Sequence, residues 1–148
     1  MGLFSRNKPE DAIEWYNRGV LLYSNNEPKH AMVCFDAALE KNPNHVGSLD
    51  NKGVLLMKLE KYEEAIKYFA RAIEIDPNDA NTLVNGGVAL DRLGRHEEAI
   101  KCYDQSILID PNMAIAWVNK SAALKNLGKH EEANNSFAIA KELGWTES

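Results

Sequence analysis

The sequence predicts an all-α protein made of four copies of a two-helix unit, and three observations lead to this fold class. Prolines recur at steps of 34 residues, at Pro43, Pro77 and Pro111, and an asparagine follows each of them. The segment "EKYEEAI" returns as "GRHEEAI" and then as "GKHEEAN" at the same period, with no insertion between the units. Within each unit, apolar residues fall largely at the spacing of an amphipathic helix.

The third unit shows most clearly where the two helices of a unit should lie. A first helix is expected over about residues 80–93 and a second over about 96–109. Gly94 suits the left-handed cap that ends the first helix. Pro111 stops the second helix, and Asn112 is expected to cap the helix that follows. The other helices are predicted by adding or subtracting 34 residues.

These helices predict one domain over nearly the whole chain. The first helix is expected to start near Pro9, with Glu10 and Asp11 beside the positive end of the helix dipole. Short tails at residues 1–8 and 146–148 would flank a single domain at 9–145. Its four units are expected at about 12–45, 46–79, 80–113 and 114–145.

A glycine column in the first helices indicates tight packing rather than a phosphate-binding loop. Gly19, Gly53 and Gly87 share the period, and Ser121 is the fourth member. Small residues recur in the second helices, beside the large residues Phe35, Phe69, Tyr103 and Phe137. Small and large residues that interlock permit the close approach that dense packing requires. No strand precedes Gly87 and no Gly-Lys-Ser/Thr follows it, as a phosphate loop would need.

The segments "AWVNKSAALKNLGKHEEA" and "LVNGGVALDRLGRHEEAIKCYDQSILIDP" resemble the tetratricopeptide repeat, and the likeness covers about residues 12–145. It departs from the family pattern at Pro28, Ser121 and Trp145. The resemblance implies antiparallel helix pairs stacked into a right-handed superhelix, an α-solenoid. The first helix of each unit would then line a concave groove. Stacking is also expected physically, because one helix pair cannot bury its own apolar stripe.

Composition and charge exclude several classes of protein. The chain has 148 residues and a net charge of −5, which argues against a general nucleic-acid binder. It has no apolar run of the ~18–20 residues that a membrane span needs. The first residues, "MGLFSRNK", are too short and too polar for a secretory signal. We therefore expect a cytoplasmic protein that binds neither nucleic acid nor membrane.

The motifs that could carry chemistry are incomplete. "HEEAI" at His96 begins like a zinc-protease motif, but Ile100 stands where the second histidine ligand is required. Cys34 and Cys102 lie 68 residues apart on stacked helices, too distant for a disulfide. His30 stands four residues before Cys34, yet no third partner for nucleophilic catalysis is apparent. We predict no enzyme activity, no metal site and no cofactor.

An asparagine column is the most informative polar feature. Asparagine is a mediocre helix former, so copies in the middle of four helices need a reason. Each amide could hydrogen-bond to the neighbouring repeat and set its register. Alternatively, each could project into the groove and hold the C=O and N–H groups of an extended peptide, as the resemblance also implies. The two readings can both hold, and the column consists of Asn17, Asn51, Asn85 and Asn119.

Other first-helix residues are predicted to contact the side chains of a peptide. Tyr16 and Tyr23 should face the groove, although each could equally pack on a neighbour. The remaining apolar candidates are Val20, Val54, Met57, Val84 and Val88. Lys58, Arg92 and Lys125 would favour an acidic segment, and their position near helix C-termini also suits the helix dipole. Of the lysine–asparagine clamp that some tetratricopeptide proteins use for chaperone tails, only the middle asparagine is present.

The function predicted from these residues is a non-enzymatic module that binds a protein or peptide partner in the groove. The alternative is an assembly element that self-associates through the open ends of the array. The last unit has Asn134 and Lys141 where the second and third have isoleucines, which lets the array end there. Because no extra helix follows to cover this face, weak homo-oligomerisation through the ends is also expected.

Overall fold

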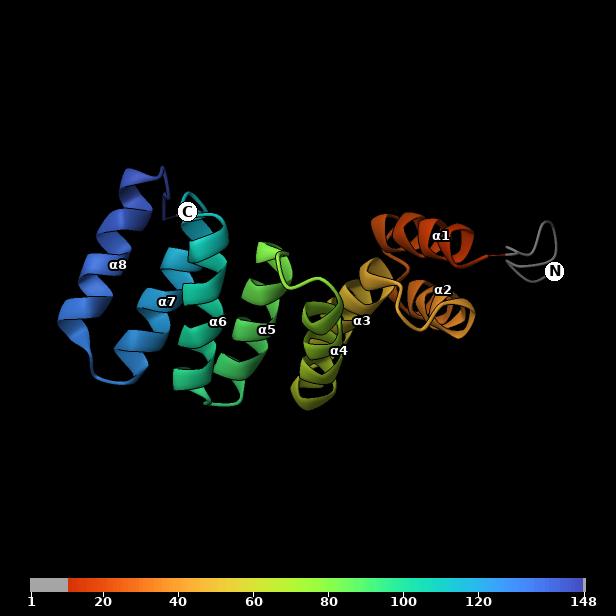
Figure 1. Ribbon diagram of the computed structural model, residues 1–148, viewed down its shortest axis with the longest axis horizontal. Helices are drawn as coiled ribbons and strands as arrows, with labels where there is room; N and C mark the ends of the chain where they lie inside the picture. Colours follow the sequence, from red (N-terminus) through yellow and green to blue (C-terminus); the bar gives the residue numbers. More distant parts are fainter. Residues whose placement is uncertain (1–10, 148) are drawn as a thin grey trace.

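The protein is an α-solenoid of antiparallel helix pairs that form a right-handed superhelix, as the sequence predicted (Figure 1). The computed structural model describes residues 11–147. Eight helices and no strands lie within that range. They are α1 (Ala12–Ser24), α2 (Pro28–Lys41), α3 (Val46–Lys58), α4 (Tyr62–Ile75), α5 (Ala80–Arg92), α6 (His96–Ile109), α7 (Ala114–Asn126) and α8 (His130–Glu142).

The first helix begins at Ala12, later than the expected start near Pro9. Asp11 is its N-cap, and its carboxylate accepts a hydrogen bond of 2.8 Å from the backbone N–H of Glu14. Asp79 caps α5 in the same way, with bonds from the N–H groups of Asn81 and Thr82. A short acidic side chain outside the helix satisfies backbone donors that have no partner within it. Pro9 and Glu10 lie outside the described residues.

The prediction that Asn112 caps the next helix was wrong. Met113 occupies the N-cap of α7, and no side chain caps that helix. The backbone N–H of Asn112 donates instead to Asp110 Oδ1 at 3.1 Å. Asn44 and Asn78 make the same bond to Asn42 and Asp76. The Pro-Asn pairs therefore belong to Asx turns that connect one repeat to the next.

Gly94 ends α5 with the predicted left-handed backbone, at φ 74°. The N–H of Arg95 returns to the carbonyl of Leu90 at 3.0 Å, which completes a Schellman motif. Gly144 has φ 94°, and the N–H of Trp145 bonds to the carbonyl of Ala140 in the same arrangement. The equivalent turns of the first two repeats use Asn26 and Glu60.

The glycine column packs against the aromatic column, as predicted. A Cβ added to Gly87 would lie 2.5 Å from the ring of Tyr103. The corresponding distance is 2.6 Å from Gly19 to Phe35 and from Gly53 to Phe69. In the fourth repeat Ser121 is buried, and its hydroxyl donates to the carbonyl of Ala133 at 2.7 Å. The missing side chain is therefore what allows the two helices of a pair to approach.

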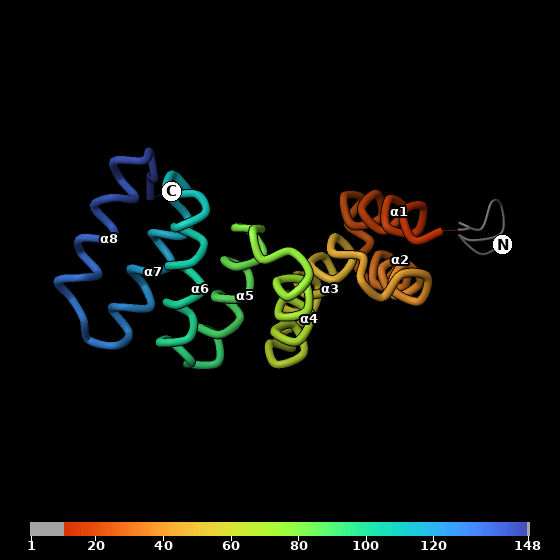
Figure 2. The backbone as a smooth tube through the Cα atoms, in the orientation of Figure 1, coloured from red at the N-terminus to blue at the C-terminus, as the bar shows by residue number. Residues whose placement is uncertain are grey.

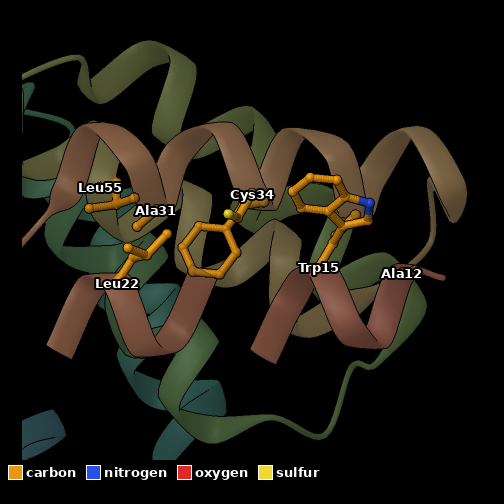
Figure 3. Packing of buried hydrophobic residues seen from close by; sticks show 8 residues of the cluster. Ala12, Trp15, Leu22, Ala31, Cys34 and Leu55 are labelled. Atoms are coloured by element: carbon orange, nitrogen blue, oxygen red, sulfur yellow. The ribbon is translucent and has the colours of Figure 1, made fainter. Parts of the chain in front are cut away.

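Each pair also packs on the next, and its direction turns along the chain (Figure 2). Leu55 of α3 extends into the core of the first repeat, beside Leu22 and Ala31 (Figure 3). Additional contacts join α3 to α5 and α5 to α7, whereas the second helices of the described repeats make no comparable contacts with each other. The first helices therefore form the inner layer of the array.

Candidate peptide-binding face

The asparagine column lies along the inner layer of helices, at the centre of α1, α3, α5 and α7. We call the surface of these helices around the column the asparagine face. Asn17 is exposed, and the side chains of the other three members are half-buried. Within residues 11–147, the side chains of Asn17, Asn51 and Asn119 make no hydrogen bond. Their amides therefore keep both donor and acceptor capacity.

Asn85 is the member of the column that contacts the neighbouring repeat. Its amide donates to Asp50 Oδ1 across the junction between the second and third repeats, at a long 3.5 Å. The hydroxyl of the fully buried Thr82 donates to the same oxygen at 2.9 Å. Asp50 and Thr82 thus link α3 to α5 beside the asparagine face. At Asn85, the geometry therefore supports the interpretation in which the amide sets the register of neighbouring repeats.

The Asp50 carboxyl lies in a mostly buried environment. Burial raises its pKa above the ordinary value, and the hydrogen bonds from Thr82 and Asn85 oppose the rise without cancelling it. The nearby carboxylate of Asp79 raises the pKa further. Desolvation thus exceeds the stabilisation of the charged form by its two donors.

The two groove tyrosines have different surroundings. The half-buried Tyr16 ring lies 4.9 Å from the His45 ring and 6.1 Å from that of Phe35. A Cβ on Gly47 would approach the Tyr16 ring to 2.9 Å, so Tyr16 packs across the first junction. The Tyr23 ring lies beneath the ammonium group of Lys58, 4.6 Å from its centroid. Two predicted site residues are therefore adjacent, joined by a cation–π contact.

The predicted apolar contacts differ in exposure. Val84 is only 6 % exposed and packs in the core around Tyr103, so its main contribution is to packing. Val20 is 36 % exposed, while Val54, Met57 and Val88 are half-buried. The cations Lys58, Arg92 and Lys125 are all exposed at the ends of the first helices.

Two exposed isoleucines on these helices were missed at the level of sequence. Ile13 is 61 % exposed and Ile115 is 38 % exposed. Each lies four residues before a member of the asparagine column, so it shares that helix face. The repeat position that they share could have revealed them, since it holds Ile13, Gly47, Asn81 and Ile115 in the four repeats. Only its first and last members are apolar and large.

A polar cluster fixes the two helices of the third repeat. Asp91 accepts a 2.8 Å hydrogen bond from the hydroxyl of the fully buried Tyr103, and its other oxygen lies 2.8 Å from His96 Nδ1. Burial, followed by the contact with Asp91, raises the Tyr103 pKa far above its ordinary value. The phenol therefore remains a hydrogen-bond donor at neutral pH. The cluster connects α5 to α6 and explains why a tyrosine replaces phenylalanine in this repeat.

The described residues contain little that points to catalysis or metal binding. Burial raises the pKa of both free thiols, Cys34 and Cys102, which favours the unreactive protonated form. Between residues 11 and 147, no group of three His, Cys, Asp or Glu side chains is placed to hold a metal ion. No described helix is both long enough and apolar enough to cross a membrane.

The comparison with protein families identifies the repeat. The Tetratricopeptide repeat model matches residues 12–45, 51–79 and 80–113, more than half of the chain. The chain belongs to the tetratricopeptide repeat family. Its fourth helix pair, α7 and α8, lies beyond the matched residues and continues the same packing. No curated protein matches the sequence.

Solved structures of similar shape include several of MamA. The chain matches "Crystal structure of MamA" with a TM-score of 0.86 at 21 % identity, over 91 % of this chain and 79 % of that one. It matches MamA 41-end from Desulfovibrio magneticus RS-1 with a TM-score of 0.86 at 24 % identity, over 94 % and 78 %. MamA AMB-1 gives 0.82 at 26 % identity, over 90 % and 79 %. These likenesses show the tetratricopeptide fold, and the family supports a module for protein–protein interaction or assembly.

Proposed function

We propose that this tetratricopeptide array binds an extended peptide segment of a partner protein on its asparagine face, without catalysing a reaction. The observation that supports this most is the column of amides on the inner helices. Three of the four have no hydrogen-bond partner among residues 11–147, although they recur at one position of the repeat. Within residues 11–147, no side-chain hydrogen bond therefore accounts for these three amides. We further propose that the protein acts in the cytoplasm.

The four amides have unequal roles in this proposal. Asn51 and Asn119 are half-buried, so the bonds that they donate to a peptide backbone would be shielded from water. The exposed Asn17 would contribute less. Asn85 can accept a bond from the peptide while its NH₂ group remains near Asp50, so it would serve register and binding together. An extended backbone offers donors and acceptors in both directions, which suits an amide better than a charged group.

The flanking residues would select the side chains of the peptide. Ile13, Val20 and Ile115 offer exposed apolar surface beside the amides. The half-buried Val54, Met57 and Val88 offer smaller patches, whereas Val84 would contribute only by supporting them. Tyr16 and Tyr23 would border the asparagine face at the first junction between repeats. Lys58, Arg92 and Lys125 would favour carboxylates in the same peptide, although exposed pairs of this kind contribute modestly.

The experiment is a peptide-array screen followed by titration of the strongest ligand. We expect Asn51→Ala and Asn119→Ala each to weaken binding about fivefold, the effect of one hydrogen bond of about 1 kcal/mol. Asn135→Ala, an exposed asparagine on α8, is the matched control and should bind as wild type does. If folded Asn51→Ala and Asn119→Ala variants also bind as wild type does, the proposal fails.

One observation favours assembly through the array ends as a second function. Leu21 is 61 % exposed, whereas its equivalents in the later repeats, Leu55, Ala89 and Ala123, are at most 3 % exposed. In the later repeats this position packs against the preceding repeat, as Leu55 does, whereas no described residue covers Leu21 in this way. A second copy of the chain could cover Leu21 by stacking end to end. Sedimentation velocity over a range of concentrations tests this, with Leu21→Lys expected to lower any self-association and Val33→Lys as the exposed control on α2.

A further inference from the structure

A second apolar site lies at the edge of the first junction, apart from the asparagine column. It is a pocket of about 410 Å³ between the start of α2 and the end of α3. Its volume falls within the ~300–1,000 Å³ of ligand-binding pockets. The wall consists of Pro28, Lys29, Met32, Leu55, Lys58 and Leu59.

The pocket coincides with a departure from the repeat pattern. At the first turn of each second helix, the later repeats carry a ring: Tyr62, His96 and His130. The first repeat has Pro28, which suits the start of a helix but is much smaller than tyrosine. In the third repeat the His96 ring turns inward to Asp91. Among residues 11–147, those that line the space beside Pro28 include no aromatic ring.

The exposure of Leu59 gives an independent measure of the same opening. Leu59 is 60 % exposed, while its equivalents Leu93 and Leu127 are half-buried. Leu93 follows Tyr62, and Leu127 follows His96, by the same 31 residues that separate Leu59 from Pro28. Among the described junctions, the leucine is therefore most exposed at the one where the preceding repeat lacks a ring at this position. A large apolar surface left open in this way favours binding of another apolar group.

The charges around the pocket define the kind of partner that fits. Both polar residues in its wall, Lys29 and Lys58, are cations, and the wall contains no carboxylate. The Lys58 ammonium group is held over the Tyr23 ring and remains exposed. We propose that this pocket receives a bulky apolar side chain from an acidic segment of a partner protein, whose carboxylates pair with Lys29 and Lys58. This site does not require the asparagine column, so it stands or falls separately from peptide binding there.

The chain contains its own reporters for the two sites. Met32 lies in the pocket wall, and Met57 belongs to the predicted contacts of the asparagine face. The probe is the peptide acetyl-Asp-Glu-Leu-Phe-Asp-Glu-amide, titrated into protein labelled with ¹³C at its methionine methyl groups. We expect a saturable shift of the Met32 resonance, which Met32→Leu assigns, and no shift of Met57. A peptide with alanine for its two apolar residues should bind at least about tenfold more weakly.

Two substitutions at one position isolate the filling of the pocket. Pro28→Tyr restores the ring of the later repeats and should abolish the Met32 shift. Pro28→Ala also removes the proline and its contact with the ligand but leaves the pocket open, so it should retain the saturable Met32 shift that Pro28→Tyr abolishes. Lys29→Glu should weaken binding about fivefold or more through charge reversal. Val33→Tyr, which adds a ring at an exposed position of α2 outside the wall, should have no effect.

Several results would overturn the proposal. One is the absence of a saturable Met32 shift at peptide concentrations up to ~1 mM. Others are wild-type affinity for the alanine peptide, or wild-type binding by Pro28→Tyr. A shift of Met57 alone would place the probe on the asparagine face and reject the pocket, whereas a shift of Met32 alone would support the pocket and leave the asparagine face to its own titration. If Pro28→Tyr does not fold, as judged by circular dichroism, the alanine peptide and Lys29→Glu still decide the question.

Discussion

The outer two junctions between repeats are held differently from the central one. At the first junction the Lys52 ammonium lies 2.5 Å from the Asp36 carboxylate and 4.5 Å from the centre of the Tyr68 ring. At the last junction the equivalent Lys120 lies 2.6 Å from Asp104. The central junction has Gly86 and Ala70 at these two positions, so an ion pair cannot form there.

The central junction has a polar link on its other side. Asp50 accepts hydrogen bonds from Thr82 and Asn85, and these bonds lie beside the asparagine face. The repeat pattern therefore specifies the packing within a helix pair, whereas the contacts between neighbouring repeats depend on residues that differ from junction to junction. Where an ion pair joins the repeats, Asn51 and Asn119 make no bond within residues 11–147. At the central junction, where no such ion pair can form, Asn85 contributes to the contact between the repeats.

Substitution of two adjacent glycines should have the largest and most contrasting effects on stability. We expect Gly87→Ala to lower the free energy of unfolding by about 2–3 kcal/mol, because the new methyl group meets the Tyr103 ring. Gly86→Ala should instead raise it by up to about 1 kcal/mol, since its nearest neighbour would lie 3.6 Å away and alanine favours the helix. Urea denaturation of both variants measures the contrast. Equal losses would show that Gly86 is also required for close packing.

Thr82→Val tests the polar link of the central junction. The substitution nearly conserves volume but removes the donor to the Asp50 carboxylate, so we expect a loss of about 1–2 kcal/mol at pH 7. The single proton of the Thr82 hydroxyl is shared with Asp79 Oδ2, which lies 3.0 Å away, and Asp79→Ala in both backgrounds separates the two partners by a double-mutant cycle. A loss that disappears entirely without Asp79 would assign the effect to the helix cap and not to the junction.

Asp50 predicts a pH dependence of stability. Because its folded-state pKa is raised above the ordinary 3.8, the folded protein favours the protonated carboxyl. The stability that this preference gives to the folded state is therefore fully present below pH 3.8 and is lost as the pH rises through the folded pKa of Asp50. The unfolding free energy of Asp50→Asn, minus that of wild type, should increase over this interval. A constant difference would show that folding does not raise the pKa of Asp50.

The ion pairs of the outer junctions should have the smallest effect. Lys52→Met and Lys120→Met are each expected to cost about 0.5–1 kcal/mol, because one partner of each pair is well exposed. Burial would lower the Lys52 pKa, but its contacts with Asp36 and Tyr68 outweigh this and raise it. The Lys52 contribution should hence be lost only above pH 10.5. Lys67→Met, on an exposed site of α4, is the control, and an equal loss there would contradict the account.

The sequence was sufficient for the helix pairs because their packing follows one period. Gly87 recurs as a glycine in the first two repeats and as Ser121 in the fourth, and Tyr103 recurs as phenylalanine, so their contact was predictable. Gly86 was not explained by its own column, which otherwise holds cations. Gly86 is explained only together with Ala70 of the neighbouring helix, because the cation and its acidic partner are both replaced at this junction. The residues at one position of the repeat do not show which position on a neighbouring helix they pair with.

The site was less predictable than the fold. The period indicated which residues share the inner helices, but not which of them the junctions would use. Tyr16 could face solvent or a neighbour, and Gly47 of the next repeat decides this by leaving room for its ring. Val84 has the spacing of a surface residue, yet the core of the third repeat buries it. Pro28 was visible as a departure, but the pocket beside it depends on Leu55 and Leu59 from the next repeat.

Asparagine amides on the inner helices are proposed to bind the backbone of a partner peptide. This claim can be tested by titrating the protein with a confirmed peptide ligand and with versions of it in which single backbone amides are replaced by esters. We predict that one ester weakens binding to wild type about fivefold and has no further effect on Asn51→Ala, which already lacks the partner. If every ester costs the same in wild type and in Asn51→Ala, the amide of Asn51 does not hold the peptide backbone, and the claim is contradicted.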